Sequence, residues 1–530
     1  MCGHHRSAHV LLTVPLAAGE VAKPVNWAAL AVGEAKAIVS LAWPMVFTGL
    51  LLYSRSMISM LFLGRLGDLS LAGGALAIGF ANITGYSVLA GLAAGMEPLC
   101  GQAFGAGRLG LVRLALHRTV LLLLCAAAPI SLLWLYIRPV LLLLGQDPAL
   151  AAAAATYLRA SLPDLLVHSF LHPLRVYLRA QSVTLPLTAC AGLSLALHLP
   201  VNYLFVSVLG LGLPGVAYAS VFTNLNLVAF LCFYIYFSGH LRGLLCFSGE
   251  CFRGWSTLLC LAVPSCASVC LEWWWYEIMI ILCGLLVDRR AAVASMGVLI
   301  QTTSLLYVFP SSLSFAVSTR VANELGANRP DRARRAAKVG LSCGAAVGVA
   351  SLCFAVAVRR AWAGMFTCDP EVLALTSSAL PLLGLCELGN CPQTAGCGVL
   401  RGSARPRAGA NINLGAFYCV GMPAAVGLAF FAGFGFVGLW VGLLAAQATC
   451  VALMLAVIGV TDWDAQAERA QQLTGGAIAD SDAGKGVAPK DSVVEKDETN
   501  KLLIKIEQQQ QIETRRSTEF DNDNNFFFCN

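Results

Sequence analysis

The 530-residue chain has few charged side chains. Asp, Glu, Lys and Arg make up only 12% of it, whereas 58% of its residues are hydrophobic. Typical soluble domains carry about 25% charged residues, so a soluble globular protein is excluded as a description of most of the chain. The composition instead predicts a protein whose main solvent is lipid.

Motifs for ATP, zinc and disulfide chemistry are also missing. The sequence contains neither a Walker loop nor an H-E-x-x-H zinc motif. Its 20 cysteines form no C-x-x-C pair and no Cys/His cluster at zinc spacing, and most of them fall within apolar segments. The basic residues are scattered over loops, which gives no support to nucleic-acid binding. We therefore predict no cofactor, no metal site and no enzymatic activity.

Apolar segments of membrane-span length make up most of the chain. About 20 apolar residues cross a bilayer as a helix, and every backbone polar group is then satisfied within the segment. We expect spans near residues 37–63, 69–96, 114–137, 156–179, 182–208, 213–237, 258–286, 291–319, 337–358, 372–400, 408–431 and 437–460. The sequence thus predicts an all-α polytopic membrane protein with twelve transmembrane helices.

The two halves of the chain repeat at a spacing of about 220 residues. Pro44 corresponds to Pro264, and Arg179 corresponds to Arg401. The glycine turn at 210–215 has its counterpart at 433–438 in the same order along the chain. Both copies contain six spans and run in the same direction, so we expect two pseudo-symmetric six-helix lobes related by an axis along the membrane normal. This architecture is typical of a transporter, with a substrate site between the lobes.

Lys and Arg are unequally distributed between the loops on the two sides. The loops after spans 2, 4, 6, 8 and 10 hold 16 of them, and the opposite set holds 7. The positive-inside rule then places both termini in the cytoplasm. We expect a cytosolic N-terminal segment at 1–35, a first lobe at 36–240, a cytosolic linker at 241–257, a second lobe at 258–460 and a disordered cytosolic tail at 461–530.

The tail carries one short motif. Glu498, Leu502 and Leu503 fit the acidic dileucine pattern that sorting adaptors read, although such six-residue matches also arise by chance. A sorting adaptor is therefore a candidate partner. The plasma membrane and an endomembrane such as that of the vacuole both remain open as locations.

A few carboxyl groups fall at membrane depth, where a charge is expensive and usually functional. Glu272 and Glu277 lie in the seventh span, Glu387 in the tenth and Asp164 in the fourth. Glu272 and Glu277 are about 140° apart around a helix, so only one of them can face a narrow cavity. A low-dielectric environment favours the neutral form of a carboxyl group, as a proton-coupled exchanger requires. The alternative is that each is a hydrogen-bonded group joining helices.

Four aromatic residues, 273–276, follow Glu272 directly. An aromatic ring beside a carboxylate can bind an organic cation. Consecutive helix positions point about 100° apart, so only one or two of the rings can share a cavity with Glu272. Tyr276, four residues from Glu272, is the best placed, and packing between helices is the expected role of the other three.

Six stretches resemble the multidrug and toxic compound extrusion (MATE) transporters, specifically the plant DETOXIFICATION proteins. The resemblance covers residues 34 to 460 and rests on the stretches 97–106, 181–186, 200–203, 271–274, 318–326 and 400–402. It implies two six-helix lobes around a cavity, alternating access, and export of small organic solutes in exchange for protons. In the plant members the coupling carboxylates are on spans 7 and 10, which correspond to Glu272 and Glu387 here. The first-span aspartate of prokaryotic relatives is not matched.

The resemblance also implies roles for other residues. Candidates for lining the substrate cavity are Asp164, Asn202, Tyr276, Gln301, Tyr307 and Asn390. Residues of the family motifs with structural roles are Pro44, Gly101, Gln102, Gly105, Arg320, Glu324, Gly326 and Arg401. The substrate stays open among organic cations, flavonoid conjugates, organic acids and hormones.

Three other functions are compatible with parts of the pattern. A lipid flippase of related architecture would need no proton-binding carboxylate. A major-facilitator transporter also has two six-span halves, but its D-R-x-G-R-type loop is missing. An intramembrane enzyme could use Asp164, His168 and His172, which share one helix face, although the two-lobe repeat argues against it.

Overall fold

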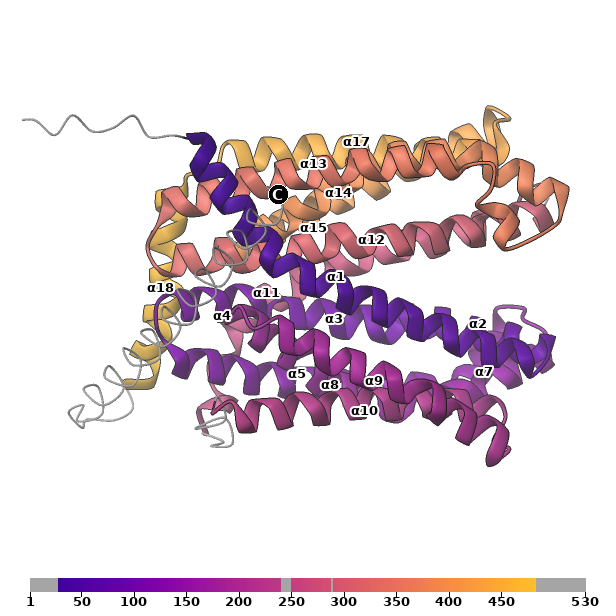
Figure 1. The fold of residues 1–530 in the computed structure, drawn as a ribbon, viewed down its shortest axis with the longest axis horizontal. Helices are drawn as coiled ribbons and strands as arrows, with labels where there is room; N and C mark the ends of the chain where they lie inside the picture. The colour runs from indigo at the N-terminus through magenta and orange to yellow at the C-terminus, as the bar shows by residue number, and fades with distance from the viewer. Residues whose placement is uncertain (1–26, 240–248, 287–288, 483–530) are drawn as a thin grey trace, which may run out of the picture.

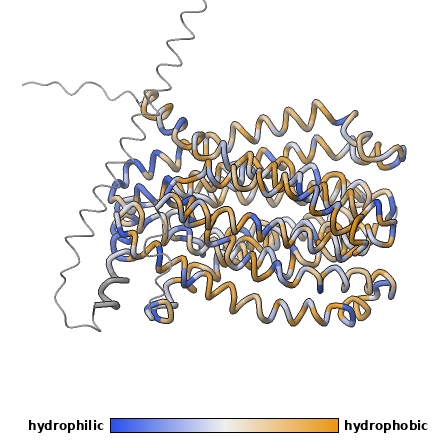
Figure 2. The backbone as a smooth tube through the Cα atoms, turned by 60° about the horizontal axis from the view of Figure 1, so that its bottom comes forward, coloured by the Kyte–Doolittle hydropathy of each residue, from blue (hydrophilic) through white to orange (hydrophobic). Residues whose placement is uncertain are grey.

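The computed structural model describes residues 27–239, 249–286 and 289–482, and all regular elements within these ranges are helices. Eleven helical segments are long and apolar enough to cross a membrane. The bent pair α7 (Pro148–Ala160) and α8 (Leu162–Ala180) forms a twelfth, with an angle of 46° between its two parts. Figure 2 shows hydrophobic residues along most of the length of the helices. The predicted all-α membrane architecture is confirmed.

The first half of the chain supplies six of these segments. They are α1 (Trp27–Arg65); the continuous run of α2 (Asp68–Ala81), η1 (Asn82–Tyr86), α3 (Ser87–Ala94) and α4 (Met96–Gly105); α5 (Leu109–Leu135); α7 with α8; α9 (Leu185–Tyr203) with η2 (Leu204–Val208); and α10 (Leu213–Phe237). The short α6 (Ile137–Leu143) links α5 to α7.

The second half supplies the other six. They are α11 (Trp255–Cys283); α12 (Arg289–Gly326); α13 (Pro330–Val358); α14 (Pro370–Gly402); α15 (Pro406–Asn413) with η5 (Leu414–Gly421), α16 (Met422–Val426) and η6 (Gly427–Phe431); and α17 (Gly435–Gly459). Two short 3-10 helices, η3 (Gly249–Phe252) and η4 (Ala363–Met365), and a final helix, α18 (Trp463–Asp482), complete the order.

The two halves begin and end their helices with the same local chemistry. Asp147 and Asp369 cap α7 and α14, each accepting hydrogen bonds from backbone N–H groups of the first turn and each followed by a proline. Such Asp-Pro pairs favour helix starts because aspartate satisfies free N–H groups and proline lacks one. Gly210, Gly212 and their counterparts in the second half have positive φ angles, which confirms the predicted glycine turns.

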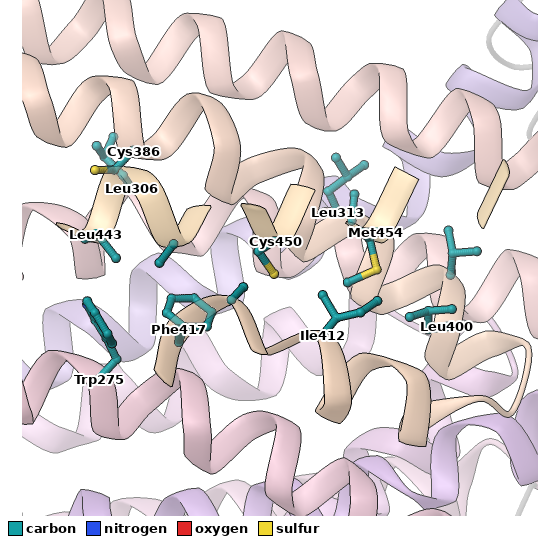
Figure 3. Close-up of a cluster of buried hydrophobic side chains, with 14 of the residues drawn as sticks. Trp275, Leu306, Leu313, Cys386, Leu400, Ile412, Phe417, Leu443, Cys450 and Met454 are labelled. Carbon is teal, nitrogen blue, oxygen red and sulfur yellow. The ribbon is translucent and has the colours of Figure 1, made fainter. Parts of the chain in front are cut away.

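Each lobe completes its hydrophobic core with the first helix of the other lobe. The large core of the second half, shown in part in Figure 3, includes Ile38, Ala42 and Met45 of α1. One core of the first half includes Leu258 and Ala262 of α11. Figure 1 shows α1 running from the second-half helices towards those of the first half. The hydrophobic cores therefore contain residues from both halves of the chain.

The lobes approach closely at the crossing of α4 and α12. A Cβ atom on Gly105 would collide with the carbonyl oxygen of Asn323, and one on Gly326 would collide with the carbonyl oxygen of Gln102. Gln102 also donates a 3.0 Å hydrogen bond from Nε2 to the carbonyl oxygen of Gly402. Glycine is required at both crossing points because the backbones touch there.

Some predicted boundaries were wrong. The motif at 97–106 was expected after span 2, but most of it forms α4, and the motif at 318–326 lies within α12. Span 4 was expected as one helix but bends at Ser161. Helix α1 starts at Trp27, inside the segment expected to precede the first lobe. Helices α4, α12 and α1 continue past their apolar stretches because polar groups at their ends contact the other lobe.

The prediction of a disordered tail was wrong for its first part. Helix α18 buries Trp463, Ala467, Ala470 and Thr474, a spacing that forms one helix face. It lies across one end of the bundle, where Figure 1 shows it spanning helices of both halves, and it contacts α4, α12 and α13. We call this the α18 end. The dileucine motif at residues 498–503 lies outside the described residues.

A substitution in α12 tests the close crossing. Gly326→Ala should destabilise the protein by about 1–3 kcal/mol, because the added Cβ atom forces two backbones apart. Gly297→Ala, in the same helix, has open space around the new methyl group and should be neutral or stabilising by up to about 1 kcal/mol. Thermal unfolding of the purified variants in detergent measures both. Equal melting temperatures for the two variants would contradict the crossing.

Candidate functional site

Glu272 lines a small closed cavity in the second lobe. The side chain lies on α11, is buried, and borders a space of about 50 Å³. The walls come from α11, α12, α14 and α15: Ser265, Ser268, Val269, Trp273, Tyr307, Thr394, Cys397, Leu400, Arg401, Pro406 and Gly409. Of the two candidate carboxylates of span 7, Glu272 is therefore the one that faces this cavity.

Two partners flank the carboxylate of Glu272. Tyr307 and Arg401 line the same cavity, and both lie close enough to the carboxylate to interact with it electrostatically. Glu277, five residues further on, points elsewhere. Its carboxylate oxygen lies 3.9 Å from the position that a Cβ atom on Gly79 of α2 would occupy. Glu277 thus faces the first lobe, as expected from the helical angle between the two residues.

Glu387 lies on α14 and is only 2% exposed. Asn390 donates a 2.9 Å hydrogen bond from Nδ2 to Glu387 Oε2, and Cys391 Sγ lies 3.8 Å from the same oxygen. Among the described residues no cation forms an ion pair with Glu387. It is held by neutral donors only, so either protonation state can be accommodated without breaking an ion pair.

A chain of polar side chains runs from Glu387 to the Glu272 cavity. Thr394 Oγ1 lies 3.4 Å from Asn390 Oδ1, and Gln393 contacts Asn413 at 3.5 Å. Asn413 then donates a 3.1 Å hydrogen bond to Ser268 Oγ, and Ser268 lines the cavity. Ser268 and Glu272 are four residues apart and share a helix face. The two carboxylates thus belong to one polar system inside an apolar lobe.

The aromatic residues after Glu272 separate as their helical directions require. Tyr276, predicted to be the best placed, is not among the residues that line the cavity, although it lies close enough to Glu272 and Glu387 to interact electrostatically with both. Trp275 is fully buried in the second-lobe core beside Phe417, as Figure 3 shows. Trp273 borders the cavity, a position that the prediction did not give it. Trp274 instead reaches the first lobe, where Nε1 donates a 3.2 Å hydrogen bond to the carbonyl oxygen of Ile83.

An ion cluster joins the lobes at the α18 end. Glu97 of α4 pairs with Arg179 at 2.8 Å and with Arg401 at 3.7 Å, and it accepts a 3.1 Å hydrogen bond from Ser318. The guanidinium carbons of Arg179 and Arg401 lie 3.9 and 5.2 Å from the centre of the Phe315 ring. Arg179 and Arg401 are the paired arginines of the sequence repeat, and they meet on one carboxylate.

A second ion cluster lies nearby on α12. Arg320 pairs with Glu34 of α1 at 2.9 Å and with Glu324 at 3.0 Å. Arg320 and Glu324 were expected to be structural, and the contact with α1 is consistent with that role. The carbonyl oxygen of Pro44, also on α1, accepts a 2.6 Å hydrogen bond from the hydroxyl group of Thr188 on α9.

The first lobe has its own polar network, centred on Asp164. Tyr86 and Asn224 donate 2.8 Å hydrogen bonds to its two oxygens, and His168 lies 3.5 Å away. Arg55 donates to Asn224. Asp164 is thus surrounded by donors and by positive charge, which favours a permanently ionised carboxylate.

The other predicted cavity residues lie apart from the Glu272 cavity. Asn202 is buried and its Nδ2 lies 3.0 Å from His198 Nε2 in the first lobe. Gln301 is half-buried on α12, where its backbone carbonyl accepts a long 3.5 Å hydrogen bond from Tyr53. Gly101 packs against Ala322 at the crossing of α4 and α12.

The polar chain contains residues that the sequence analysis did not single out. These are Ser268, Gln393, Thr394, Asn413 and Gln447, the last of which lies 3.4 Å from Asn390. The amide residues among them could have been found from the sequence, because amide side chains are rare inside apolar spans. Asn224 and Gln447 also occupy corresponding positions at the ends of the two halves, and each contacts its own lobe's polar network.

No arrangement typical of an enzyme appears among the described residues. No group of three or more His, Cys, Asp or Glu side chains in these ranges could hold a metal ion. The stretch 340–344 matches the G-x-S-x-G pattern of hydrolases, but it lies within the uninterrupted helix α13, where Ser342 donates to the carbonyl oxygen of Lys338. A nucleophile elbow requires a strand-to-helix turn.

Comparison with known families identifies the family of the chain. Residues 44–204 and 264–426 both match the MatE family model. The chain belongs to the MatE family. The two matches begin at the paired prolines of the repeat, Pro44 and Pro264, so the predicted repeat and the MATE resemblance are confirmed. As a MatE (multidrug and toxic compound extrusion) protein it is an integral membrane transporter and not an enzyme.

Two plant proteins are similar to the chain over most of its length. Protein DETOXIFICATION 49 of Arabidopsis thaliana is 60% identical over 454 residues, which cover 85% of this chain and 90% of that protein. Protein DETOXIFICATION 51 of the same plant is 59% identical over 474 residues, covering 89% of each chain.

Solved structures agree on the fold. The eukaryotic MATE transporter AtDTX14 superposes with a TM-score of 0.80 at 33% identity, covering 84% of this chain and 99% of that one. The Vibrio cholerae MATE transporter VcmN in its bent form has a TM-score of 0.70 at 19% identity, with coverage of 84% and 99%, which shows the shared fold.

The ion cluster at the α18 end predicts a large effect of one substitution. Glu97→Gln should lower stability by about 3–5 kcal/mol, because it leaves Arg179 and Arg401 buried without their shared carboxylate. Asp331→Asn, at an exposed helix start, is the matched control and should change stability by less than about 0.5 kcal/mol. Thermal unfolding of both variants in detergent is the measurement. A Glu97→Gln protein as stable as the control would show that the cluster does not hold the lobes together.

Proposed function

We propose that this MatE transporter exports small organic solutes from the cytoplasm in exchange for protons. The observation that carries the proposal is the pair of buried carboxylates, Glu272 and Glu387, joined by a polar chain within one lobe. Ionisable groups at membrane depth are costly and are retained where they bind ions or substrate. Within the part of the chain that the structure describes, neither carboxylate is held in a close ion pair, so each can gain and lose a proton.

Proton binding and substrate release are linked by charge in this mechanism. With Glu272 and Glu387 ionised, the second lobe favours a substrate arriving from the cytoplasm. Protons entering from the acidic side neutralise the carboxylates and weaken that site, so the substrate leaves. A later loss of the protons to the cytoplasm restores the ionised state. The binding of one species thus opposes the binding of the other, as exchange requires.

Arg401 supplies a physical link between the site and the movement of the lobes. It borders the Glu272 cavity and also pairs with Glu97 of the first lobe. Arg401 Nη2 donates a 2.7 Å hydrogen bond to Ser314 Oγ, whereas its buried Nε atom has no hydrogen-bond partner and lies 3.7 Å from Glu97. A change in the charge of Glu272 therefore acts on an ion cluster that joins the lobes. Coupling needs such an element, whose equilibrium both sites bias.

Asp164 supports the first lobe in this scheme and does not exchange protons. Its two oxygens accept hydrogen bonds from Tyr86 and Asn224, with Arg55 beyond. A carboxylate so well supplied with donors stays ionised.

An organic cation is the substrate class that the chemistry around Glu272 favours, and the cavity of about 50 Å³ must widen before such a molecule can enter it. Tyr276 and Trp273 place aromatic rings beside Glu272, and an aromatic face next to a carboxylate binds cations with a delocalised or quaternary charge. We place both termini in the cytoplasm, because the arginine-rich loops lie on that side by the positive-inside rule. The α18 end is then cytoplasmic, and its ion clusters close the protein towards the cytoplasm.

Transport by reconstituted protein tests the proposal. Proteoliposomes with an acidic lumen should take up a fluorescent organic cation, because protons leaving the lumen drive exchange. Glu272→Gln and Glu387→Gln should fold and insert but lose the pH-driven component of uptake. Wild-type uptake by the Glu272→Gln protein would contradict the proposed coupling site.

Glu277→Gln is the control for that experiment. It removes a carboxylate from the same helix, five residues away, but not from the cavity, and it should keep pH-driven uptake. If uptake by the wild type did not depend on the pH difference, the result would instead favour a flippase-like mechanism or another driving ion.

A further inference from the structure

A second pocket lies at the α18 end, on the other side of Pro406, which borders both this pocket and the Glu272 cavity. It has a volume of about 550 Å³, within the roughly 300–1,000 Å³ of small-molecule sites. Three segments form it: the first turns of α11, the connection from α14 to α15, and α18. The lining residues are Ser256, Thr257, Cys260, Leu261, Ala404, Arg405, Pro406, Arg407, Ala408, Arg469 and Leu473. We call it the arginine pocket.

Three arginines enter the arginine pocket from two separate segments. Arg405 donates hydrogen bonds to the hydroxyl groups of Ser403 and Thr461, at 3.2 and 2.9 Å, and Arg407 lies 3.8 Å from Cys260 Sγ. These partners are neutral. Among the described residues no carboxylate forms an ion pair with Arg405, Arg407 or Arg469, and no acidic residue lines the pocket.

The positive charges in the pocket repel one another. Burial and the nearby Arg469 lower the pKa of Arg405, which lies in the connection between two spans. Like charges gathered in a partly buried pocket are unfavourable unless an anion neutralises them. The pocket also includes the first turn of α11, whose free backbone N–H groups add to the positive potential. A phosphate group, with oxygens that accept several guanidinium hydrogen bonds, matches this environment.

An apolar path leads from the arginine pocket along the outside of α11. Ser256 and Cys260 line the pocket, and Val263 and Ala267 follow at helical spacing. All four are exposed, and with Leu259 beside them they form a stripe on the outer face of this membrane-spanning helix. A ligand with a phosphate head and hydrocarbon tails would place its head among the arginines and its tails on this stripe.

We propose that the arginine pocket binds the phosphate-bearing headgroup of an anionic phospholipid, whose acyl chains lie along the exposed stripe of α11. The site is independent of the proposed transport mechanism, since it shares no ionisable residue with the Glu272 cavity. A bound lipid would connect α11, the α14–α15 connection and α18, and would fasten α18 to the membrane surface. Basic pockets of this kind at the cytoplasmic surface bind lipid headgroups.

Lipid binding by the purified full-length chain tests the site. Native mass spectrometry would titrate the protein with phosphatidylinositol phosphate and, as the neutral reference, with phosphatidylcholine of the same acyl chains. The anionic lipid should bind more tightly, and added salt should weaken it. Arg407→Gln and Arg469→Gln should each reduce its affinity by about fivefold, the fold-change that corresponds to one basic contact near a membrane surface.

Matched variants separate the site from general charge effects. Arg332→Gln removes an exposed arginine of α13 that does not line the pocket, and it should leave the affinity unchanged. Arg469→Lys keeps the charge and should keep most of the binding. Both Arg407 and Arg469 are exposed, so their substitution should not alter the melting temperature without lipid.

Two results would overturn the proposal. Equal affinity of the wild type and the double variant of Arg407 and Arg469 for the anionic lipid would place the lipid elsewhere. Equal affinity for the water-soluble inositol bisphosphate and for the lipid would show that the acyl chains contribute nothing, and would assign the pocket to a free phosphate compound.

Discussion

The contact of α4 with α12 is the constraint on which the arrangement of the two lobes depends. Two glycines, Gly105 and Gly326, let the backbones touch, and each lies against a carbonyl group of the other lobe. On α4, Glu97 pairs with Arg179 of its own lobe and reaches Arg401 of the other lobe. Helix α18 then covers the same region, with Gln471 Nε2 donating a 2.9 Å hydrogen bond to the carbonyl oxygen of Gly326. The crossing, the ion cluster and α18 therefore form one unit at this end of the molecule.

The two lobes share a fold but have different electrostatics. Asp164 of the first lobe is saturated by donors, whereas Glu387 of the second has only neutral amide and thiol partners. A carboxylate with strong donors is held in one charge state, and one with weak partners can change state at little cost. The two lobes thus have similar backbones but different side chains. The polar network of the first lobe has a structural role, and that of the second lobe carries the proposed proton exchange.

Much of the fold was predictable because membranes restrict it so strongly. Span length, backbone satisfaction and the repeat predicted twelve helices in two lobes, and these are confirmed. The sequence did not predict that α1 packs into the second-half core and that α11 packs into a first-half core. The periodicity of apolar residues on a helix does not indicate which other helix they contact. Helix α18 was missed because its buried face has only one large apolar residue, Trp463, with two alanines and Thr474, so its apolar signal is weak in a polar tail.

The candidate site was predictable in part. Glu272, Glu387, Tyr307 and Asn390 could be named because ionisable and polar groups are rare in spans or match family motifs. The polar chain between the carboxylates required the structure, since Asn413 and Ser268 are more than a hundred residues apart in sequence. Trp273 was assigned to packing although it borders the cavity, because a helical angle alone does not tell how wide a cavity is.

The exchange of first helices has a consequence for how the chain is assembled. Ile38, Ala42 and Met45 emerge early in synthesis, but their packing partners lie in the second half of the chain. The first lobe in turn lacks Leu258 and Ala262 until α11 has been inserted. Neither half can therefore finish folding by itself, and the final packing step must await synthesis of most of the chain. The two lobes are thus products of a single folding event.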